Sequence, residues 1–330
     1  MKTIGWGIIG FGGQYSMGNE HARYIDATGV LKTVAFCEVE PARLEGARKD
    51  HPDATAYASL DEMLKNPVVE GVTIVTPHNT HFDLAMQVLR AGRHAVVEKP
   101  ICITVREVDG LIDEARKNKK MLSAYHNRRW DADILTIKSL VQKGTIGEVF
   151  HVEVAVGTYG DPGSTWRSDK KASGGCFYDW GVHLVDYALQ IIPDPIESVT
   201  GFFYKRVWNV SNEDHTQANI RFKGGKFAEV TVSTIAAAPR EKFRILGTKG
   251  AITGGWDLLT VHLPQQGFST VGEIRVGQGQ HPQFYLNVAA HLTSGAPLAV
   301  TPESARRNIG VIECAEQSAK TGQPVKPPHE

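Results

Sequence analysis

Residues 179–186 of the 330-residue chain combine two aspartates with a histidine at helical spacing. Asp179 and His183 are four residues apart, so their side chains share one face if the segment is a helix. A carboxylate beside an imidazole orients the ring and raises its basicity, which suits proton transfer near neutral pH. Asp186 lies on nearly the same face. The same pattern is also typical of a buried structural histidine satisfied by one hydrogen bond.

A lysine follows the apolar run Ala95–Val97, within the sequence Glu98-Lys99-Pro100. An ammonium group is costly to bury, so a lysine is unusual at the end of a buried strand. Two interpretations stay open. Lys99 pairs with Glu98, or it is a positioned cation that polarises a carbonyl or stabilises a forming alkoxide.

Two histidines, His78 and His81, follow another apolar run in the segment Thr76-Pro77-His78-Asn79-Thr80-His81. Taken alone, this pair could ligate a metal. No downstream cluster of acids or cysteines completes such a site, so we expect no metal. The segment follows a strand of the expected sheet, at the edge where such sheets bind ligands.

A glycine-rich segment separates the first apolar run from a helical pattern. Glycines there permit a tight turn and let backbone N–H groups approach a pyrophosphate, to which the helix N-terminus adds its dipole. Gly18 comes three residues later than the third glycine of the G-x-G-x-x-G pattern. The residues expected to contact a dinucleotide here are Gly10, Phe11, Gly12, Gly13 and Gln14.

An acidic residue, Glu38, ends the next strand pattern, where a carboxylate can accept both hydroxyls of the NAD ribose. Glu38 and Glu40 together would repel a 2′-phosphate, so the sequence favours NAD over NADP. The simpler alternative is a solvated acid that starts a turn.

The first 125 residues alternate between strand and helix patterns, which predicts a doubly wound parallel sheet. The strand patterns are Thr3–Ile9, Leu31–Cys37, Val72–Val75, Ala95–Val97 and Met121–Ala124. The helical patterns are Asn19–Ala27, Ala42–Asp50, Asp61–Lys65, His81–Arg90 and Val105–Asn118. Helix caps of the [ST]-x-x-[DE] type are predicted at Ser59/Glu62, Thr80/Asp83 and Thr104/Glu107.

Beyond residue 150, successive strand patterns joined by short glycine-rich turns predict a largely antiparallel sheet. These strands are His151–Gly157, Ser198–Trp208, Thr216–Phe222, Phe227–Thr234, Phe243–Leu246 and Leu258–Leu263. Helices are expected at Val182–Gln190, Phe284–Thr293 and Pro302–Thr321. The tail from Lys326 should fray. We therefore expect two domains, a cofactor-binding one at 1–125 and an α+β substrate-binding and oligomerisation domain at 126–330.

Composition narrows the class of protein. Lysine plus arginine and aspartate plus glutamate each number 36, so the basic surplus of a nucleic-acid binder is absent. No apolar run reaches the ~20 residues that span a bilayer, so no membrane association is expected. The four cysteines form no C-x-x-C pair, which argues against a zinc ribbon or a disulfide framework. A cytoplasmic enzyme is the expectation.

Taken together, several motifs resemble the Gfo/Idh/MocA family, which includes glucose–fructose oxidoreductase and inositol dehydrogenase. In chain order they are G-F-G-G…G-N-E-H, C-E-V-E-P-A-R, T-P-H-N-T-H, E-K-P, N-R-R-W-D, W-R and D-W-G-V-H-L-V-D. The likeness covers nearly the whole chain, and E-K-P followed by D-x-G-x-H is more specific than a glycine-rich loop alone.

This resemblance implies roles for individual residues. Lys99 would be the catalytic lysine, and Asp179 and His183 the acid–base pair. Residues implied to lie along the cofactor are Glu38, Thr76, Pro77, His78, Asn79, His81, Glu98, Lys99, Asn127, Trp166 and Arg167. Residues expected to contact substrate are Lys99, Arg128, Trp166, Arg167, Asp179, Trp180 and His183. The second half would be the family's open-faced sheet, through which a homodimer or homotetramer would form.

The expected activity is hydride transfer between NAD and a secondary alcohol or ketone carbon of a sugar, inositol or sugar derivative. His183 would take or give the hydroxyl proton, Asp179 would hold the imidazole, and Lys99 would stabilise alkoxide charge. Whether His183 or Lys99 is the immediate base stays open. Two alternatives stay open. One is a glycosidase in which bound NAD transiently oxidises the sugar, and the other is a sensor that binds NAD without chemistry.

Overall fold

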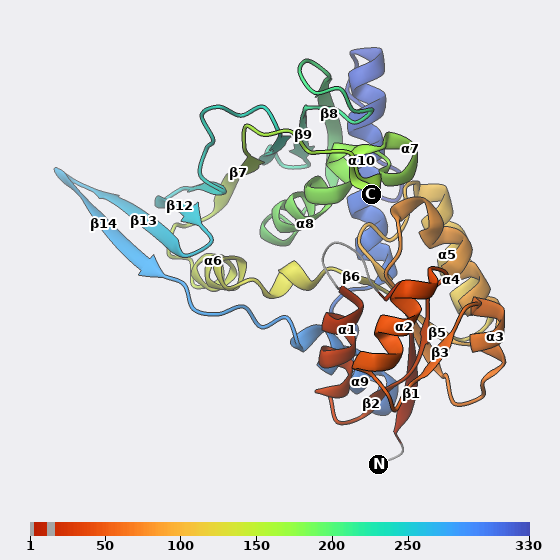
Figure 1. Ribbon diagram of the computed structural model, residues 1–330. Helices are drawn as coiled ribbons and strands as arrows, with labels where there is room; N and C mark the ends of the chain where they lie inside the picture. Colours follow the sequence, from red (N-terminus) through yellow and green to blue (C-terminus); the bar gives the residue numbers. More distant parts are fainter. Residues whose placement is uncertain (1–2, 12–16) are drawn as a thin grey trace. The chain divides into compact units, whose positions relative to one another are not determined.

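The computed structural model describes residues 3–11 and 17–330, which form two compact units. The first unit comprises the chain up to His126 together with Pro282–Arg306. The second comprises Asn127–His281 and the chain from Arg307 to Glu330. Figure 1 shows the elements of each unit in chain order by colour.

The first unit is built on a six-stranded sheet in which every neighbouring pair is parallel. Its strands are β1 (Ile4–Ile9), β2 (Leu31–Cys37), β3 (Thr55–Tyr57), β4 (Gly71–Ile74), β5 (His94–Glu98) and β6 (Leu122–Tyr125). Their order is β3-β2-β1-β4-β5-β6, so the direction of winding reverses between β1 and β4. Ligands of such sheets bind outside the carboxyl ends of the strands at that point.

Helices connect successive strands of this sheet. They are α1 (Met17–Asp26), α2 (Pro41–Asp50), α3 (Leu60–Lys65), α4 (His81–Arg90) and α5 (Val105–Lys117). The strands are nearly continuous apolar runs with buried side chains, because helices cover both faces of a doubly wound sheet. The predicted parallel sheet is confirmed, although the short strand β3 gave no pattern of its own.

Of the three predicted helix caps, one is confirmed. The Thr104 side chain accepts the backbone N–H of Glu107 over 3.2 Å, and the Glu107 carboxylate accepts the N–H of Thr104 over 2.9 Å. Ser59 and Thr80 form no such bond, so those two predictions were wrong. The Thr80 hydroxyl instead donates to the Pro77 carbonyl over 2.7 Å. This bond to the preceding backbone takes the place of a bond to the N–H groups of the first helical turn.

Helix α9 (Gln283–Ser294) packs with the first unit, although its place in the chain put it with the second half. The reason is a set of buried contacts within that unit. The Tyr285 hydroxyl bonds to His21 and Thr73, and the Ser123 hydroxyl donates to the Val300 carbonyl over 2.8 Å. The segment Pro282–Arg306 therefore completes the core of the first unit beside β4 and β6.

The second unit carries an eight-stranded sheet in the order β14-β13-β12-β11-β7-β10-β9-β8. Its strands are β7 (Val149–Gly157), β8 (Ile196–Tyr204), β9 (His215–Phe222), β10 (Phe227–Ser233), β11 (Phe243–Gly247), β12 (Gly250–Gly255), β13 (Leu258–Gln265) and β14 (Phe268–Arg275). Only β7 and β10 among these neighbours pair in parallel. The expected, mostly antiparallel sheet is confirmed.

Several helices belong to the second unit. They include α6 (Ala132–Gln142), α7 (Lys170–Ser173), α8 (Val182–Ile191) and most of α10 (Pro302–Thr321). Helix α8 is buried almost throughout and packs against β7 and β10. At the other end of the sheet, the hairpin of β13 and β14 extends away from its neighbours (Figure 1), and β14 is exposed along almost all of its length.

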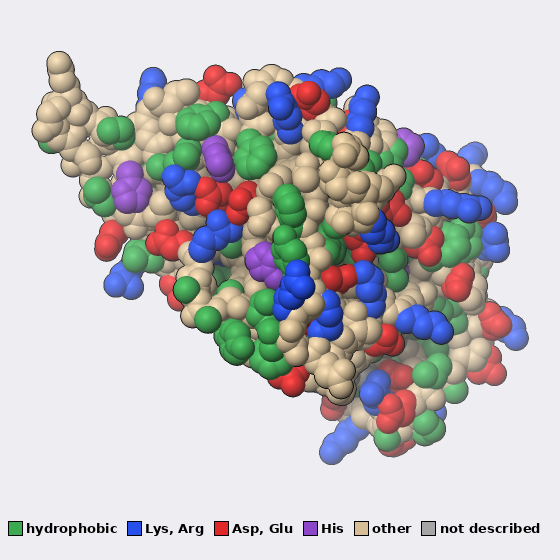
Figure 2. Space-filling view, turned by 90° about the horizontal axis from the view of Figure 1, so that it is seen from above, with side chains coloured by type: hydrophobic (Ala, Val, Ile, Leu, Met, Phe, Trp, Pro, Cys, Tyr) green, Lys and Arg blue, Asp and Glu red, His purple; other side chains and the backbone are tan. Residues whose placement is uncertain are grey.

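The sequence also predicted a surface without a basic surplus and a chain without membrane-spanning segments. On the face that Figure 2 shows, positive and negative side chains are interspersed, as expected from equal numbers of each. Every helix within residues 3–11 and 17–330 is too short or too polar to cross a bilayer.

Candidate active site

In the turn after β1 and at the start of α1, the backbone lies very close to the backbone of other segments. Gly10 has φ of +85°, and a Cβ there would lie 2.2 Å from the Val75 carbonyl oxygen. A Cβ on Gly18, in α1, would lie 2.4 Å from the carbonyl oxygen of Phe11. Gly18 thus permits the close helix–strand packing that the third glycine of a dinucleotide-binding turn provides. The predicted contacts Gly12, Gly13 and Gln14 lie outside the described residues.

Glu38 follows β2, and its carboxylate is held at the same edge of the sheet. Oε2 accepts the backbone N–H of Phe11 over 3.2 Å, and Oε1 accepts the N–H of Glu40 over 3.1 Å. Only 7% of Glu38 is exposed. The carboxylate is therefore fixed beside the glycine turn rather than solvated, and each oxygen retains a lone pair for a ribose hydroxyl.

The turn after β4 is tied to the end of β5 by a buried histidine. The two ring nitrogens of His81 lie 2.8 Å from the Pro100 carbonyl oxygen and 2.9 Å from that of Thr76. Burial lowers the pKa of His81, so the ring is neutral and donates to one of the two. Because both nitrogens face carbonyl oxygens, His81 is a structural link. The described residues contain no group of three or more side chains placed to hold a metal ion.

Glu98 and Lys99 leave β5 at the same edge. The Glu98 carboxylate accepts the backbone N–H of Lys99 over 2.9 Å, and its other oxygen lies 3.1 Å from Nε2 of His21. Burial opposes ionisation of Glu98, but the hydrogen bond from His21, the charge of Lys99 and the Lys99 N–H together hold the pKa of Glu98 below its ordinary value. The acid is thus bound to a histidine and to backbone. In the β5–β6 register, Glu98 lies opposite Tyr125.

In the second unit, Asp179 and His183 lie on one continuous helical segment. A π-helical turn, Phe177–Gly181, holds Asp179 and runs directly into α8, whose second residue is His183. The helical spacing predicted from sequence is therefore met, and π turns are frequent at functional sites. The carboxylate of Asp179 lies 3.8 Å from Nε of Arg167, whose guanidinium lies over the ring of Trp166. His183 is 4% exposed.

Asp186 has a different role from its neighbours on α8. Its two oxygens accept from Nε and Nη2 of Arg129 over 2.8 and 2.7 Å. A third bond comes from Nδ2 of Asn308 over 2.9 Å. This buried, bidentate pair fixes α8 to the segment that follows Asn127. Asp186 thus stabilises the helix that carries His183.

Trp180 lies beside His183, and it forms with Arg128 and Trp256 a cluster that we call the aromatic wall. The Trp180 ring lies 6.0 Å from the ring of His183 and 6.1 Å from that of Trp256. The guanidinium of Arg128 lies 4.6 Å from the centre of the Trp180 ring. Arg128 and Trp180 were expected from sequence, and Trp256 was missed.

Trp256 is held in an unusual position. Its φ is +48°, a left-handed conformation that is rare for tryptophan, and its N–H donates to Asp133 over 2.9 Å. The buried ammonium of Lys242 lies 3.7 Å from the ring centre and 2.7 Å from Asp133. Trp256 nevertheless stays 46% exposed. Strained, exposed aromatics held this firmly are typical of functional sites. The only local signal in the sequence is its place in the turn Gly254-Gly255-Trp256-Asp257.

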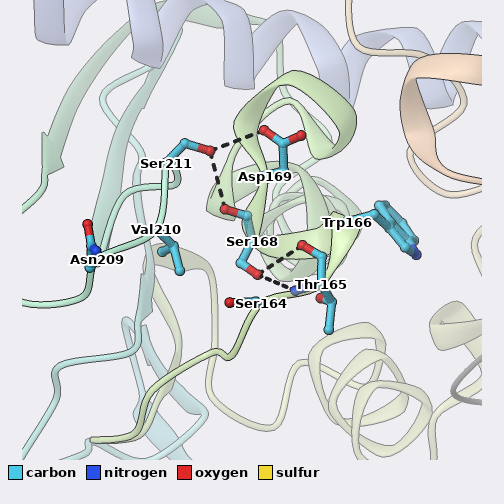
Figure 3. A pocket seen from close by; sticks show the side chains of 8 residues that line it. All are labelled: Ser164, Thr165, Trp166, Ser168, Asp169, Asn209, Val210 and Ser211. Carbon is cyan, nitrogen blue, oxygen red and sulfur yellow. Dashed lines mark hydrogen bonds between the residues drawn. The ribbon is translucent and has the colours of Figure 1, made fainter.

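A cavity of about 490 Å³ lies in the second unit beside Trp166. Figure 3 shows Trp166 pointing away from the Ser211 side of this cavity. The Ser168 hydroxyl is bound to the N–H and C=O of Thr165, and the Ser211 hydroxyl lies 3.2 Å from Asp169. These hydroxyls are used in local bonds, so the cavity wall is polar and already ordered around the segment that precedes Arg167.

The structure describes the predicted site residues within their own units. The first unit gathers Glu38 with Phe11, Thr76 with His81, and Glu98 with Lys99 at the carboxyl edge of one sheet. Asn79 and His78 lie in the turn between β4 and α4. The second unit gathers Asp179 with Arg167 and Trp166, and His183 with Trp180. Asn127 begins the short turn that also carries Arg128.

Comparison with known proteins identifies the family. Residues 4–126 match the oxidoreductase family with an NAD-binding Rossmann fold, and residues 134–253 match the GFO/IDH/MocA C-terminal domain. The chain belongs to the Gfo/Idh/MocA family. It is therefore an oxidoreductase with an NAD-binding first domain.

Individual relatives are similar over about three quarters of the chain or more. The chain is 28% identical to scyllo-inositol 2-dehydrogenase (NADP(+)) IolW of Bacillus subtilis, with 97% of this chain and 95% of that protein covered. It is 27% identical to myo-inositol 2-dehydrogenase of Thermotoga maritima over 74% of this chain and 73% of that protein. Among solved structures, the oxidoreductase YvaA of Bacillus subtilis superposes with a TM-score of 0.91, at 26% identity and 98% coverage of both chains.

Proposed function

We propose that this protein transfers hydride between NAD and a secondary alcohol or ketone carbon of a sugar, inositol or sugar derivative. The observation that carries this proposal is the pairing of two elements in a Gfo/Idh/MocA chain. A lysine stands at the carboxyl edge of the dinucleotide-binding sheet, and an aspartate and a histidine share a helical segment in the second unit. The inositol dehydrogenases among the relatives support the substrate class.

The described residues suit a dinucleotide. Gly10 and Gly18 leave no room for a Cβ, and Glu38 presents a fixed carboxylate beside them. The further predicted contacts along the cofactor are Thr76, Pro77, His78, Asn79, His81, Glu98 and Lys99, and those predicted near the nicotinamide are Asn127, Trp166 and Arg167. When bound, NAD supplies C4 of its nicotinamide as the hydride acceptor. Glu38 and Glu40 favour NAD over NADP in our proposal, whereas the relative IolW is named for NADP.

His183 and Lys99 have different roles in the reaction: His183 transfers the proton, and Lys99 stabilises charge. In the oxidation, the carbon-bound hydrogen leaves with its electron pair as hydride, and the hydroxyl proton passes to the imidazole of His183. Lys99 stabilises the negative charge that develops on the oxygen. Asp179 holds the imidazole in the orientation for transfer. The oxygen ends as a carbonyl, and the imidazole carries the proton until it is released to solvent.

The aromatic wall would bind the ring of the substrate. Cyclic polyols and sugars carry apolar C–H faces, which stack on indole rings. Trp180, beside His183, and Trp256 provide two such rings at right angles to each other, and Trp166 provides a third beside Arg167. Arg128 contributes donors to hydroxyl groups while its charge is balanced by Asp131, 3.0 Å away.

The second unit would also form the oligomer. We propose a homodimer or homotetramer through the face of the eight-stranded sheet that α8 leaves uncovered. This face carries several ion pairs, such as the one between Arg240 and Glu229, whose Nη2 and Oε1 atoms lie 2.6 Å apart. A polar interface of this kind fits an enzyme whose subunits recognise each other specifically. We place the enzyme in the cytoplasm, because all four cysteines are free.

A spectrophotometric screen tests the function. NADH formation at 340 nm is followed with inositols, hexoses, pentoses and sugar acids, each with NAD and with NADP. The expected result is steady-state NADH with at least one cyclic polyol or sugar. Cleaved sugar without net NADH would instead indicate a glycosidase, and NAD binding without turnover of any compound would indicate a sensor. Either result would refute the proposal.

A further inference from the structure

A buried chain of hydrogen bonds connects the core of the first unit to the carboxyl end of β5. The indole N–H of Trp6 donates to the Thr73 hydroxyl over 2.8 Å. That hydroxyl lies 2.9 Å from the Tyr285 hydroxyl, which lies 2.7 Å from Nδ1 of His21. Nε2 of His21 lies 3.1 Å from Oε1 of Glu98. The hydrogen-bonded chain thus runs through five elements, β1, β4, α9, α1 and β5, and ends one residue before Lys99.

Burial makes this chain an all-or-none arrangement. Trp6, Thr73, His21 and Tyr285 are 0% exposed, and 13% of the Glu98 side chain is exposed. A buried polar group that loses its hydrogen-bond partner is destabilising, so each member of the chain depends on the next. The ring of Tyr125 lies 4.3 Å from that of His21 and restricts the plane of the imidazole.

The indole of Trp6 sets one consistent direction for the hydrogen bonds along this chain. Trp6 can only donate, so the Thr73 oxygen accepts. Within residues 3–11 and 17–330, the Thr73 hydroxyl has Trp6 and Tyr285 as its partners, so its own proton goes to Tyr285. Tyr285 then donates to Nδ1 of His21. In this arrangement Nδ1 of His21 accepts and Nε2 donates to Glu98.

We propose that His21 is a positioning residue for the reaction, holding the Glu98 carboxylate against the backbone N–H of Lys99 and so fixing the place of the Lys99 amine. Glu98 receives two donors, His21 on one oxygen and the Lys99 N–H on the other. An acid at this edge of the sheet could simply contact the cofactor. The chain of hydrogen bonds that ends at Glu98 instead anchors the backbone of Lys99, the residue that carries the amine. This role depends on the proposed function, in which Lys99 stabilises alkoxide charge.

The tautomer of His21 provides a test that requires no substrate. Nitrogen-15 NMR of histidine-labelled protein near neutral pH separates the two neutral tautomers from the charged ring. The His21 signals are assigned as those missing in His21→Gln. We expect a neutral ring protonated on Nε2. A ring protonated on Nδ1, or on both nitrogens, overturns the inference whether or not the enzyme turns over any compound.

Kinetics and amide exchange provide the second test. In His21→Phe we expect faster hydrogen exchange at the Lys99 amide and a kcat about 10- to 100-fold lower, because small displacements of a catalytic group are this costly. The Kd for NADH should stay within about threefold. His21→Gln keeps a donor and an acceptor and should recover most of kcat. His94→Asn is the matched control, since His94 is partly buried at the opposite end of β5 and its Nδ1 accepts the Met121 N–H.

A second variant covers the case in which His21→Phe fails to fold. Tyr285→Phe keeps the ring and removes the hydroxyl that orders His21, and Tyr57→Phe removes a comparable hydroxyl, bound to Asn66 over 3.0 Å. Only Tyr285→Phe should change the His21 tautomer and the exchange of Lys99. Wild-type exchange and kcat in His21→Phe or Tyr285→Phe would overturn the inference. A wild-type protein that oxidises nothing refutes the proposed function alone, because the tautomer and exchange results still decide this one.

Discussion

Replacing Glu38 with glutamine should weaken the discrimination between NAD and NADP. Only 7% of Glu38 is exposed, and two backbone N–H groups hold its carboxylate. It therefore cannot turn away from a 2′-phosphate that takes the place of the ribose hydroxyl. The change to glutamine keeps the size of the side chain and an acceptor oxygen while removing the charge.

The size of the effect follows from Coulomb's law. Two unit charges about 4 Å apart repel by ~4 kcal/mol at an effective dielectric constant of about 20. A phosphate that keeps part of its hydration loses roughly half of this, which leaves about 2 kcal/mol, or about 30-fold in affinity. We expect the wild type to bind NAD at least about 30-fold more tightly than NADP, and Glu38→Gln to lose most of this ratio.

Fluorescence titration with NADH and NADPH measures both dissociation constants directly. Glu45→Gln is the control, because Glu45 lies on α2 with 72% of its side chain exposed and pairs with Arg48. It should leave the ratio unchanged. Equal affinity for the two cofactors in the wild type, or an unchanged ratio in Glu38→Gln, would refute the role of Glu38.

Three further outcomes are expected. Trp256→Ala should raise KM for the substrate about 10-fold with little change in kcat, because ring stacking is lost. Trp208→Ala, the control, should leave KM unchanged. A KM in Trp256→Ala equal to that of the wild type would exclude Trp256 from the site. Burial opposes ionisation of Asp131, but hydrogen bonds from His281 and Tyr187 outweigh it and lower its pKa to about 2. Its stabilisation is present above about pH 4 and is lost as the pH falls toward 2, so Asp131→Asn should cost about 2 kcal/mol in urea unfolding at pH 7 and little near pH 2; an equal cost at both would contradict this. Light scattering should find a dimer or tetramer, and a monomer at working concentration would exclude the proposed interface.

The parallel sheet could be predicted because each of its strands carries its own signal. Strands buried on both faces are apolar throughout, so β1, β2, β4, β5 and β6 appear as separate runs in the sequence. The chemistry at their carboxyl ends follows from position alone. This is why Glu38 and Lys99 could be assigned to one edge of the sheet before any coordinates.

Elements that depend on partners could not be predicted. Strand β14 is exposed almost throughout and exists through its pairing with β13, so its own pattern is weak. The tail from Lys326 was expected to fray, but the Glu330 carboxylate accepts from Arg307 over 2.7 Å and from the Ile196 N–H over 2.8 Å. Trp256 was missed for the same reason, because Asp133, far away in sequence, holds its backbone and Lys242 lies over its ring.

The turnover of two variants tests most directly whether Lys99 and His183 act on one alcohol. With a substrate from the NAD screen and saturating NAD, NADH formation is measured for the wild type, Lys99→Ala and His183→Ala. Each variant should lose about 10²- to 10⁴-fold in kcat, the usual contribution of a positioned acid–base or charge-stabilising group, while its Kd for NADH stays close to that of the wild type. Full activity in both variants would contradict the mechanism.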